Sequence, residues 1–293
     1  MRRTLSSLFL AGSLLASPLT SAEEVYLKHQ GLTLNANLTL AEDSGYERMF
    51  LITHGTLAHN AMEIITTWQE LLSDEGISSL AINLSLGQDN RHDMYDCPTT
   101  HNHKHTDATS EIGQWVNWLK DKGSTEIILA AHSRGGNQTA WYSDENSDSA
   151  VKAQILLAPQ TWSETYEQEN YAERYKKPLT PILEKAKQMP AEKVMQDTDF
   201  IYCEKASVTA GSFVSYYQAD QRFDTPTLLH SAKIPTLVIA GSEDTTVPGL
   251  YAKMSSVGNE MITSVEIEGA GHFFRDLYMD EVIENTVEFL DSL

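Results

Sequence analysis

Short apolar runs alternate with stretches of helical periodicity along most of the chain. Residues 61–72 and 112–119 and the C-terminal segment 282–293 carry apolar side chains at helical spacing, which predicts amphipathic helices. The apolar runs have the length of strands that are buried in a sheet. These runs cover residues 24–29, 32–40, 49–53, 77–84, 126–131, 153–158, 234–240 and 265–267. The first two are expected to form a hairpin around Gly31. The alternation predicts an α/β fold, with a mostly parallel central sheet flanked by helices.

Residues 161–231 interrupt this alternation. The stretch contains no strongly apolar run, is rich in Glu, Lys, Gln and Tyr, and lies between the expected strands 153–158 and 234–240. The chain must therefore leave the sheet and return to it. Helical spacing in pieces of the stretch predicts a helical cap, inserted into one domain that covers residues 23–293. Its aromatic side chains have two open roles, packing on the core or lining a substrate site.

Residues 1–22 have the pattern of a secretory signal peptide. Arg2 and Arg3 come first, an apolar run covers residues 5–15, and residues 20–22 are small and suited to cleavage. The alternative is a buried N-terminal helix. The run is shorter than the ~20 residues that a membrane-spanning helix needs, and no later segment is apolar enough to anchor the chain. We therefore expect an exported protein, periplasmic or secreted, without stable membrane insertion.

The formal net charge of −20 bears on the class of partner. Such a surface repels the phosphates of nucleic acids and the headgroups of anionic lipids, so neither is expected as a partner. The charge favours solubility but does not indicate the substrate. Nothing in the sequence indicates the oligomeric state.

The strongest candidate for chemistry is the segment AHSRGG, which has Ser133 at its third position. It follows the expected strand 126–131 and opens a helical stretch. A nucleophilic serine sits on a tight turn between a strand and a helix, where small residues two positions before and after it let the two elements approach. Ala131 and Gly135 occupy those positions, and alanine in place of the more common glycine still fits sterically. Ser133 is therefore predicted to be a nucleophile.

With this motif the chain resembles the α/β-hydrolase superfamily over essentially all of residues 23–293. The resemblance implies a catalytic triad in the chain order nucleophile, acid, histidine. The acid is then expected after a late strand, where Asp244 follows the apolar run 234–240 and precedes a Val-Pro pair. Glu243 is the near rival. The structural alternative for Asp244 is a turn or a helix cap, in which aspartate is common.

The histidine of the implied triad is His272, in the segment GAGHFF between the expected strand 265–267 and the final helix. Glycines in this loop let the chain bring an imidazole over Ser133, and the alternative is a surface histidine without a catalytic role. In the expected mechanism, His272 takes the proton of Ser133 as Ser133 attacks a carbonyl carbon. Asp244 orients the imidazole, an acyl-enzyme forms, and water then releases the acid.

Backbone N–H groups are expected to bind the oxyanion, because their positions are fixed without the ordering of a side chain. One donor is Arg134, the residue after the nucleophile. The resemblance implies a second donor in the loop after the strand 49–53, where Thr56 follows a His-Gly pair. His54, the histidine of that pair, is expected to be structural.

Two further features leave alternatives open. Cys97 and Cys203 form a disulfide in an oxidising compartment only if their Cβ atoms meet, which the sequence does not show. In the loop 92–107, His101 and its neighbours form a His-x-His-x-His pattern that suits zinc on an extended segment. The other interpretation is a solvated, histidine-rich loop near the mouth of the site. The triad needs no metal, so neither a metal nor another cofactor is expected.

The sequence therefore predicts a serine hydrolase that cleaves a carboxylic ester or a related acyl bond of a small-molecule substrate. A thioesterase or a peptidase with the same triad is the alternative within the enzymes. A ligand-binding protein that keeps the fold without activity is the alternative from another class. Sensitivity to chelators would separate a metal-dependent enzyme built on the loop 92–107 from all of these.

Overall fold

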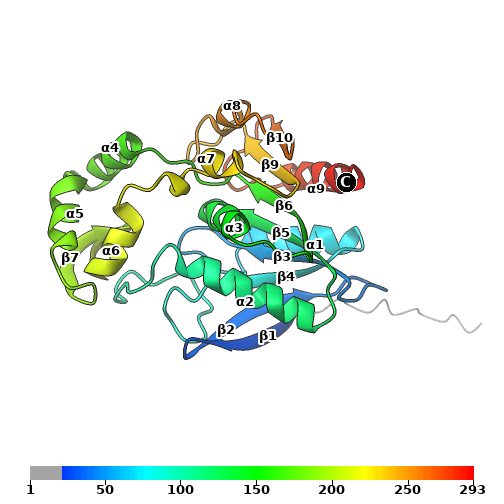
Figure 1. Ribbon diagram of the computed structural model, residues 1–293, viewed down its shortest axis with the longest axis horizontal. Coiled ribbons are helices and arrows are strands. Elements are labelled where there is room, and N and C mark those ends of the chain that lie inside the picture. The colour runs from blue at the N-terminus through cyan, green and yellow to red at the C-terminus, as the bar shows by residue number, and fades with distance from the viewer. Residues whose placement is uncertain (1–21) are drawn as a thin grey trace, which may run out of the picture.

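The computed structural model of the protein describes residues 22–293 (Figure 1). Apart from Ala22, the predicted signal peptide lies outside the described residues. Within the described residues, no helix combines the length and the apolar character that crossing a membrane requires.

An eight-stranded sheet forms the centre of the molecule, in the strand order β1-β2-β4-β3-β5-β6-β9-β10. The first two strands form the hairpin that was predicted around Gly31, and β2 also pairs antiparallel with β4. Every other neighbouring pair is parallel. This mostly parallel sheet confirms the predicted fold class. The strands are β1 (Glu23–His29), β2 (Leu32–Thr39), β3 (Arg48–Thr53), β4 (Ser78–Asn83), β5 (Glu126–His132), β6 (Val151–Leu157), β9 (Thr236–Gly241) and β10 (Ile262–Ile267).

Helices cover both faces of the sheet, and alternate side chains of a strand pack against opposite faces. In β3, Met49 belongs to the buried cluster that contains Trp115 of the helix α2. Its neighbour Phe50 belongs to the cluster that contains Trp68 of the helix α1. Burial on both faces explains why the strands read as continuous apolar runs. The helices around the sheet are α1 (Glu63–Asp74) and α9 (Leu277–Asp291), α2 (Asp107–Asp121) and α3 (Arg134–Glu145), and the short α8 (Leu250–Met254).

The insertion between β6 and β9 forms a cap at one end of the sheet (Figure 1). The sequence predicted a helical cap over residues 161–231, and helices are present, but the structure adds an antiparallel hairpin to them. The hairpin escaped the sequence pattern because its register shifts between Met195 and Thr198, where the exposed Gln196 and Asp197 break the alternation. The cap elements are α4 (Glu164–Tyr175), α5 (Leu179–Lys187), β7 (Val194–Phe200), β8 (Cys203–Thr209), α6 (Ala210–Tyr217), η1 (Gln221–Phe223) and α7 (Thr225–Leu229).

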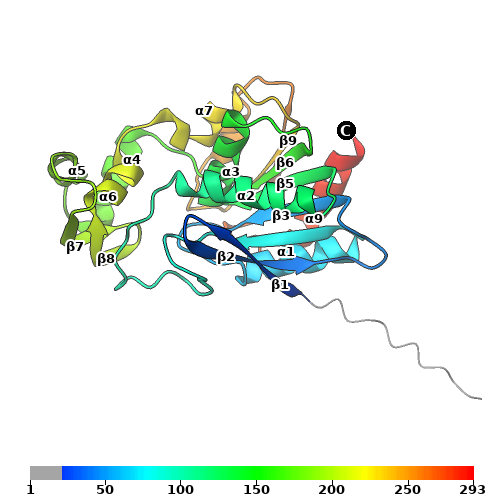
Figure 2. The same cartoon turned by 60° about the horizontal axis from the view of Figure 1, so that its bottom comes forward.

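The long connection between β4 and α2 ties the core to the cap, and Figure 2 shows it reaching β8. The His101 N–H donates to the Ser207 carbonyl at 2.8 Å, and the His101 carbonyl accepts from the Thr209 N–H at 2.9 Å. These bonds make a parallel bridge to β8. In the same region Cys97 forms a disulfide with Cys203, so the pairing that the sequence left open is present.

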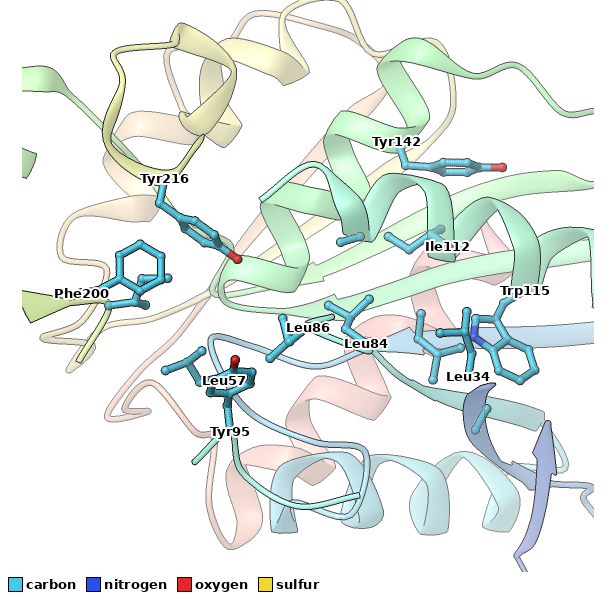
Figure 3. Packing of buried hydrophobic residues seen from close by; sticks show 14 of the residues in the cluster. Leu34, Leu57, Leu84, Leu86, Tyr95, Ile112, Trp115, Tyr142, Phe200 and Tyr216 are labelled. Atoms are coloured by element: carbon cyan, nitrogen blue, oxygen red, sulfur yellow. The ribbon is translucent and has the colours of Figure 1, made fainter. Parts of the chain in front are cut away.

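Aromatic side chains fill the junction between the cap and the core (Figure 3). Phe200 and Tyr216 of the cap belong to the same buried cluster as Leu57 and Tyr95 of the core. Phe200 also lies edge-on to Tyr216, with ring centroids 5.2 Å apart. The cap is therefore held by the burial of apolar surface as well as by a covalent bond.

Replacing both Cys97 and Cys203 with serine is expected to lower the free energy of unfolding by about 2–5 kcal/mol. The bond joins positions separated by 106 residues, so its loss restores a large conformational freedom to the unfolded chain. Guanidinium-induced unfolding followed by tryptophan fluorescence measures the change. A reducing agent should lower the stability of the wild type to that of the double variant and leave the double variant unaffected. An unchanged unfolding midpoint in the double variant would contradict the expectation.

Candidate active site

Ser133 occupies a strained turn between β5 and α3. Its φ of 57° and ψ of −124° form a combination that costs free energy for a residue with a side chain. Backbone hydrogen bonds hold the turn, because the Ser133 N–H donates to the Leu157 carbonyl at 3.0 Å and the Ser133 carbonyl accepts from the Gln160 N–H at 3.0 Å. The turn lies at the carboxyl end of β5, the edge of a parallel sheet at which ligands bind.

The small residues that follow the serine are required by their surroundings. A Cβ atom on Gly135 would lie 2.2 Å from the His54 carbonyl oxygen, and one on Gly136 would lie 2.8 Å from the Pro159 Cβ. Neither position has room for a side chain. Gly135 therefore lets α3 begin directly against the end of β3 and the loop after it, and Gly136 lets α3 pack against the segment after β6.

Ser133, His272 and Asp244 form a continuous chain of hydrogen bonds. The Nε2 atom of His272 lies 3.0 Å from Ser133 Oγ, and its Nδ1 atom lies 2.7 Å from Asp244 Oδ2. Ser133 follows β5, Asp244 follows β9 and His272 follows β10, so the hydrogen bonds join three separate parts of the chain. Glu243, the rival acid, is exposed, and it is Asp244 that contacts the imidazole. The structure thus brings together the three residues that the sequence singled out.

The Asp244 carboxylate is surrounded by hydrogen-bond donors. Its Oδ1 atom accepts from the N–H groups of Thr246 at 2.7 Å and Val247 at 2.9 Å. Burial raises the pKa of Asp244, but the hydrogen bonds from His272 and from the two N–H groups outweigh burial and leave the pKa below its ordinary value. An ionised carboxylate fixes a proton on Nδ1 of His272 and leaves Nε2 as an acceptor facing Ser133.

Thr56 and Arg134, the expected oxyanion donors, lie beside the serine on two different elements. Arg134 Nε donates to Thr56 Oγ1 at 3.0 Å, which joins the start of α3 to the loop after β3. Gly55 packs against Ser133, since a Cβ atom on Gly55 would lie 3.2 Å from Ser133 Cβ. Among residues 22–293, the backbone N–H groups of Thr56 and Arg134 have no hydrogen-bond acceptor. Both N–H groups are available to an oxyanion.

A buried network around His54 holds the loop after β3. The Leu84 N–H donates to His54 Nε2 at 3.1 Å, and an Arg91 guanidinium nitrogen lies 3.1 Å from the same atom. His54 Nδ1 lies 2.9 Å from the Gly55 carbonyl oxygen. Burial lowers the pKa of His54 to about 3, so the ring is neutral and donates from Nδ1. These contacts fit the structural role that the sequence predicted for His54.

Ser133 and His272 open into a pocket of about 260 Å³ whose walls come from the core and from the cap. Met62, Ile64 and Phe273 contribute apolar side chains to the lining, and Tyr202 of the cap also belongs to it. The sequence did not indicate Tyr202 as a site residue, because Tyr202 follows a strand that has no clear apolar pattern. The open question about the cap aromatics thus has two answers, since Phe213 is fully buried in the core cluster and Tyr202 lines the pocket.

Three histidines of the loop 92–107 are buried although His92 and most of the other loop residues are exposed, so the solvated-loop interpretation holds only in part. The exposed fractions of His101, His103 and His105 are 0%, 1% and 0%, because the segment passes beneath the cap. The ring of His103 lies 2.8 Å from the Tyr216 hydroxyl, and His105 Nε2 lies 3.0 Å from the Asn137 amide oxygen. In the part of the chain that the structure describes, no group of three His, Cys, Asp or Glu side chains is placed to hold a metal ion. The geometry therefore favours a packing role over the zinc site.

Comparisons with known proteins agree with this architecture. The family model described as "Alpha/beta hydrolase family" matches residues 50–285, and no curated protein matches the sequence. Est1E from Butyrivibrio proteoclasticus is similar in structure, with 19% identity and a TM-score of 0.64 over 92% of this chain and 100% of that chain. E-2-(acetamidomethylene)succinate hydrolase has 16% identity and a TM-score of 0.61 over 92% and 100% of the two chains. An alpha-beta serine hydrolase homologue from Coxiella burnetii has 16% identity and a TM-score of 0.58 over 93% and 99%. At these identities the similarities establish a shared fold.

Proposed function

The chain belongs to the alpha/beta hydrolase family, and from this premise we propose that it is a serine hydrolase that works through an acyl-enzyme on Ser133. The proposed reaction is the hydrolysis of a carboxylic ester, or a related acyl bond, in a small-molecule substrate. The observation that carries the proposal is the hydrogen-bonded chain from Ser133 Oγ through His272 to Asp244. The structurally similar proteins include hydrolases, and this agrees with the hydrolytic reaction that we propose for this chain.

Each step of the proposed reaction uses one feature of the site. Ser133 Oγ attacks the carbonyl carbon while Nε2 of His272 accepts its proton, and the ionised Asp244 stabilises the imidazolium that forms. The N–H groups of Thr56 and Arg134 bind the oxyanion of the tetrahedral intermediate. The imidazolium then gives its proton to the leaving alcohol, and the acyl group stays on Ser133. Water attacks this ester in the same way and releases the carboxylic acid.

We also propose that the protein is exported, as the N-terminal pattern predicts. The Cys97–Cys203 disulfide supports this location, because such bonds persist in oxidising compartments. The net charge of −20 supports a substrate other than nucleic acid. N-terminal sequencing of the mature protein tests export, since cleavage after Ala22 would leave residue 23 at the N-terminus.

A fluorophosphonate probe tests the activated serine directly. The purified wild type is expected to be labelled covalently, whereas the Ser133→Ala variant is expected to give no label and His272→Ala only a trace. Ser255→Ala is the matched control, because Ser255 is an exposed serine outside the site and its loss should leave labelling unchanged. Failure of the folded wild type to label, or labelling that survives in Ser133→Ala, would overturn the proposed function.

A further inference from the structure

A second pocket lies beside the triad pocket, and the two share the side chain of Tyr202. The second pocket is lined by Arg134 of the core, by Arg174 and Glu167 of α4, and by further tyrosines of the cap. Its volume is about 70 Å³, which gives room for a few water molecules or a small polar group. A carboxylate group fits in such a space. We refer to it as the arginine pocket.

Arg134 brings a positive charge to the arginine pocket and, within the described residues, forms no ion pair there. Its side chain contacts neutral groups, with Nε donating to Thr56 Oγ1 at 3.0 Å and a terminal nitrogen lying 3.3 Å from His105 Nδ1. The guanidinium also lies 5.3 Å from the centre of the Tyr216 ring. Among residues 22–293, the ion pairs of the chain include neither Arg134 nor Arg174. A partly buried guanidinium with neutral partners is stabilised when an anion joins it.

Arg174 reaches the same pocket from the outside. Its guanidinium lies 4.3 Å from the centre of the Tyr202 ring, the side chain that the two pockets share. A guanidinium that stacks on an aromatic face keeps its edge free, and that edge carries the parallel N–H donors that bind a carboxylate with two hydrogen bonds. The aromatic contact thus orients Arg174 without using its donors.

Two phenol groups add further donors. Tyr217 Oη accepts from the Ile201 N–H at 3.0 Å, and Tyr175 Oη accepts from the Tyr202 N–H at 2.9 Å. Within the described residues neither phenol proton has an acceptor, and both side chains line the arginine pocket. The turn that supplies the two N–H groups is strained, with φ values of 37° at Ile201 and 67° at Tyr202.

Glu167 is the acidic member of the lining. Burial raises the pKa of its carboxyl group, while Arg134 and Arg174 lower it. Even with Glu167 ionised, two guanidinium groups leave the pocket with a net positive charge, on a protein whose formal charge is −20. The pocket is therefore a local exception to the charge of the chain, and it lies next to the proposed nucleophile.

We propose that the arginine pocket binds a carboxylate of the substrate through Arg134 and Arg174, so that the preferred substrates are esters that carry a second, ionised carboxyl group. This inference rests on the proposed function, because it names the substrate class of the same site. The ester lies over Ser133 in the triad pocket, and the carboxylate passes Tyr202 into the arginine pocket. Guanidinium and phenol donors replace the water that solvates the carboxylate.

Matched substrates test the proposal. Monoethyl esters of succinic, glutaric, adipic and pimelic acids are compared with the corresponding ethyl ester amides, in which a neutral carboxamide of the same shape replaces the carboxylate. Acetate esters of 4-hydroxybutanoic and 6-hydroxyhexanoic acids, with their amides, place the charge on the alcohol side. Hydrolysis is followed by titration of the released acid. We expect at least one acid to exceed its amide by about tenfold or more in kcat/KM, as one good charge-assisted contact implies.

Arg174→Gln is the diagnostic variant. It is expected to reduce the ratio of kcat/KM for the acid to that for the amide by about tenfold, mainly through KM, and Arg174→Lys should restore part of the ratio. Arg222→Gln is the control, because Arg222 also stacks at 4.3 Å on an aromatic ring, that of Trp141, but lies outside both pockets. Its ratio should equal that of the wild type. Equal rates for acids and amides in every pair, or an unchanged ratio in Arg174→Gln, would overturn the proposal.

A binding measurement separates failure of this inference from failure of the proposed function. If no ester is hydrolysed, the proposed function fails, and calorimetric titration of the wild type with adipate and with adipamide still tests the pocket. Binding of adipate that is weakened in Arg174→Gln supports the carboxylate site. Absence of binding by adipate and by the shorter diacids overturns it. If neutral esters are hydrolysed without preference for the acids, only the carboxylate site is wrong.

Discussion

The His272→Ala variant is expected to hydrolyse an alkyl ester with a kcat about 10⁵- to 10⁶-fold below that of the wild type. Nε2 of His272 is the proposed base for Ser133 and lies 3.0 Å from its Oγ atom. Without the imidazole, the serine keeps its proton at neutral pH and the leaving alcohol receives none. Asp244→Asn is expected to cost about 10⁴-fold, because an amide accepts no bond of equal strength from Nδ1 and favours the wrong tautomer.

Two comparisons make this expectation specific. Glu243→Ala removes the neighbouring acid, which is exposed, and its kcat should stay near that of the wild type. The double variant Ser133→Ala/His272→Ala should lose no more activity than either single variant, since the two residues act as one unit. Steady-state kinetics with ethyl butyrate supply the values. The proposed triad would be contradicted if the fold-loss of kcat in the double variant equalled the product of the two single losses. A larger loss of kcat in Glu243→Ala than in Asp244→Asn would also contradict it.

Much of the fold and the proposed triad could be predicted because both depend on local constraints. The parallel strands are buried on both faces, so each appears as a continuous apolar run. Ser133 stands where one such run ends and small residues begin, and the glycine at position 135 has no room for a Cβ atom beside the His54 carbonyl. Asp244 and His272 follow two other runs. The end of a parallel strand is where a side chain can reach the shared edge of the sheet.

The cap side of the site could not be predicted, because its residues meet through tertiary contacts. Tyr202 enters the pocket from a hairpin turn, and the adjoining strand β7 loses its alternation at an irregular register. Arg174 lies on an exposed helix whose sequence reads as a solvated surface. The solvated-loop interpretation of residues 92–107 was wrong for three of its histidines for the same reason. The spacing of the histidines in the sequence cannot show that the cap covers His101, His103 and His105.

Acid is expected to unfold the protein at a pH near 5, far above the pH at which carboxylates alone would act. Five buried histidines are neutral in the native state. Burial lowers the pKa of His54, His103 and His132 to about 3 and that of His101 to about 4, and it lowers that of His105 well below its ordinary value. In the unfolded chain each has a pKa of about 6.5.

The direction of the effect follows from which state binds the protons. Below pH ~6.5 the unfolded chain takes up protons that the native state excludes, so stability is complete above that pH and falls as the pH drops toward the native pKa values. Each histidine contributes a slope of about 1.4 kcal/mol per pH unit, and the five together contribute at most about 7 kcal/mol per pH unit. Integrated from pH 7 to pH 5, the loss from the histidines is at most about 9 kcal/mol, against a typical stability of about 5–15 kcal/mol. Glu111 offsets part of this loss, because burial raises its pKa to about 7 and the native state takes up its proton before the unfolded chain does.

Urea unfolding at intervals from pH 7.5 to pH 4.5 measures this slope. His103→Gln removes one buried histidine, and below pH 6 its slope should be smaller than that of the wild type by about 1.4 kcal/mol per pH unit, whatever the variant's stability at neutral pH. His230→Gln is the control, because His230 is exposed and its loss should leave the slope unchanged. A stability that stays constant between pH 6.5 and pH 4.5 would mean that the buried histidines take up protons in the native state. Neutral histidine rings would then not explain how the cap is attached to the core.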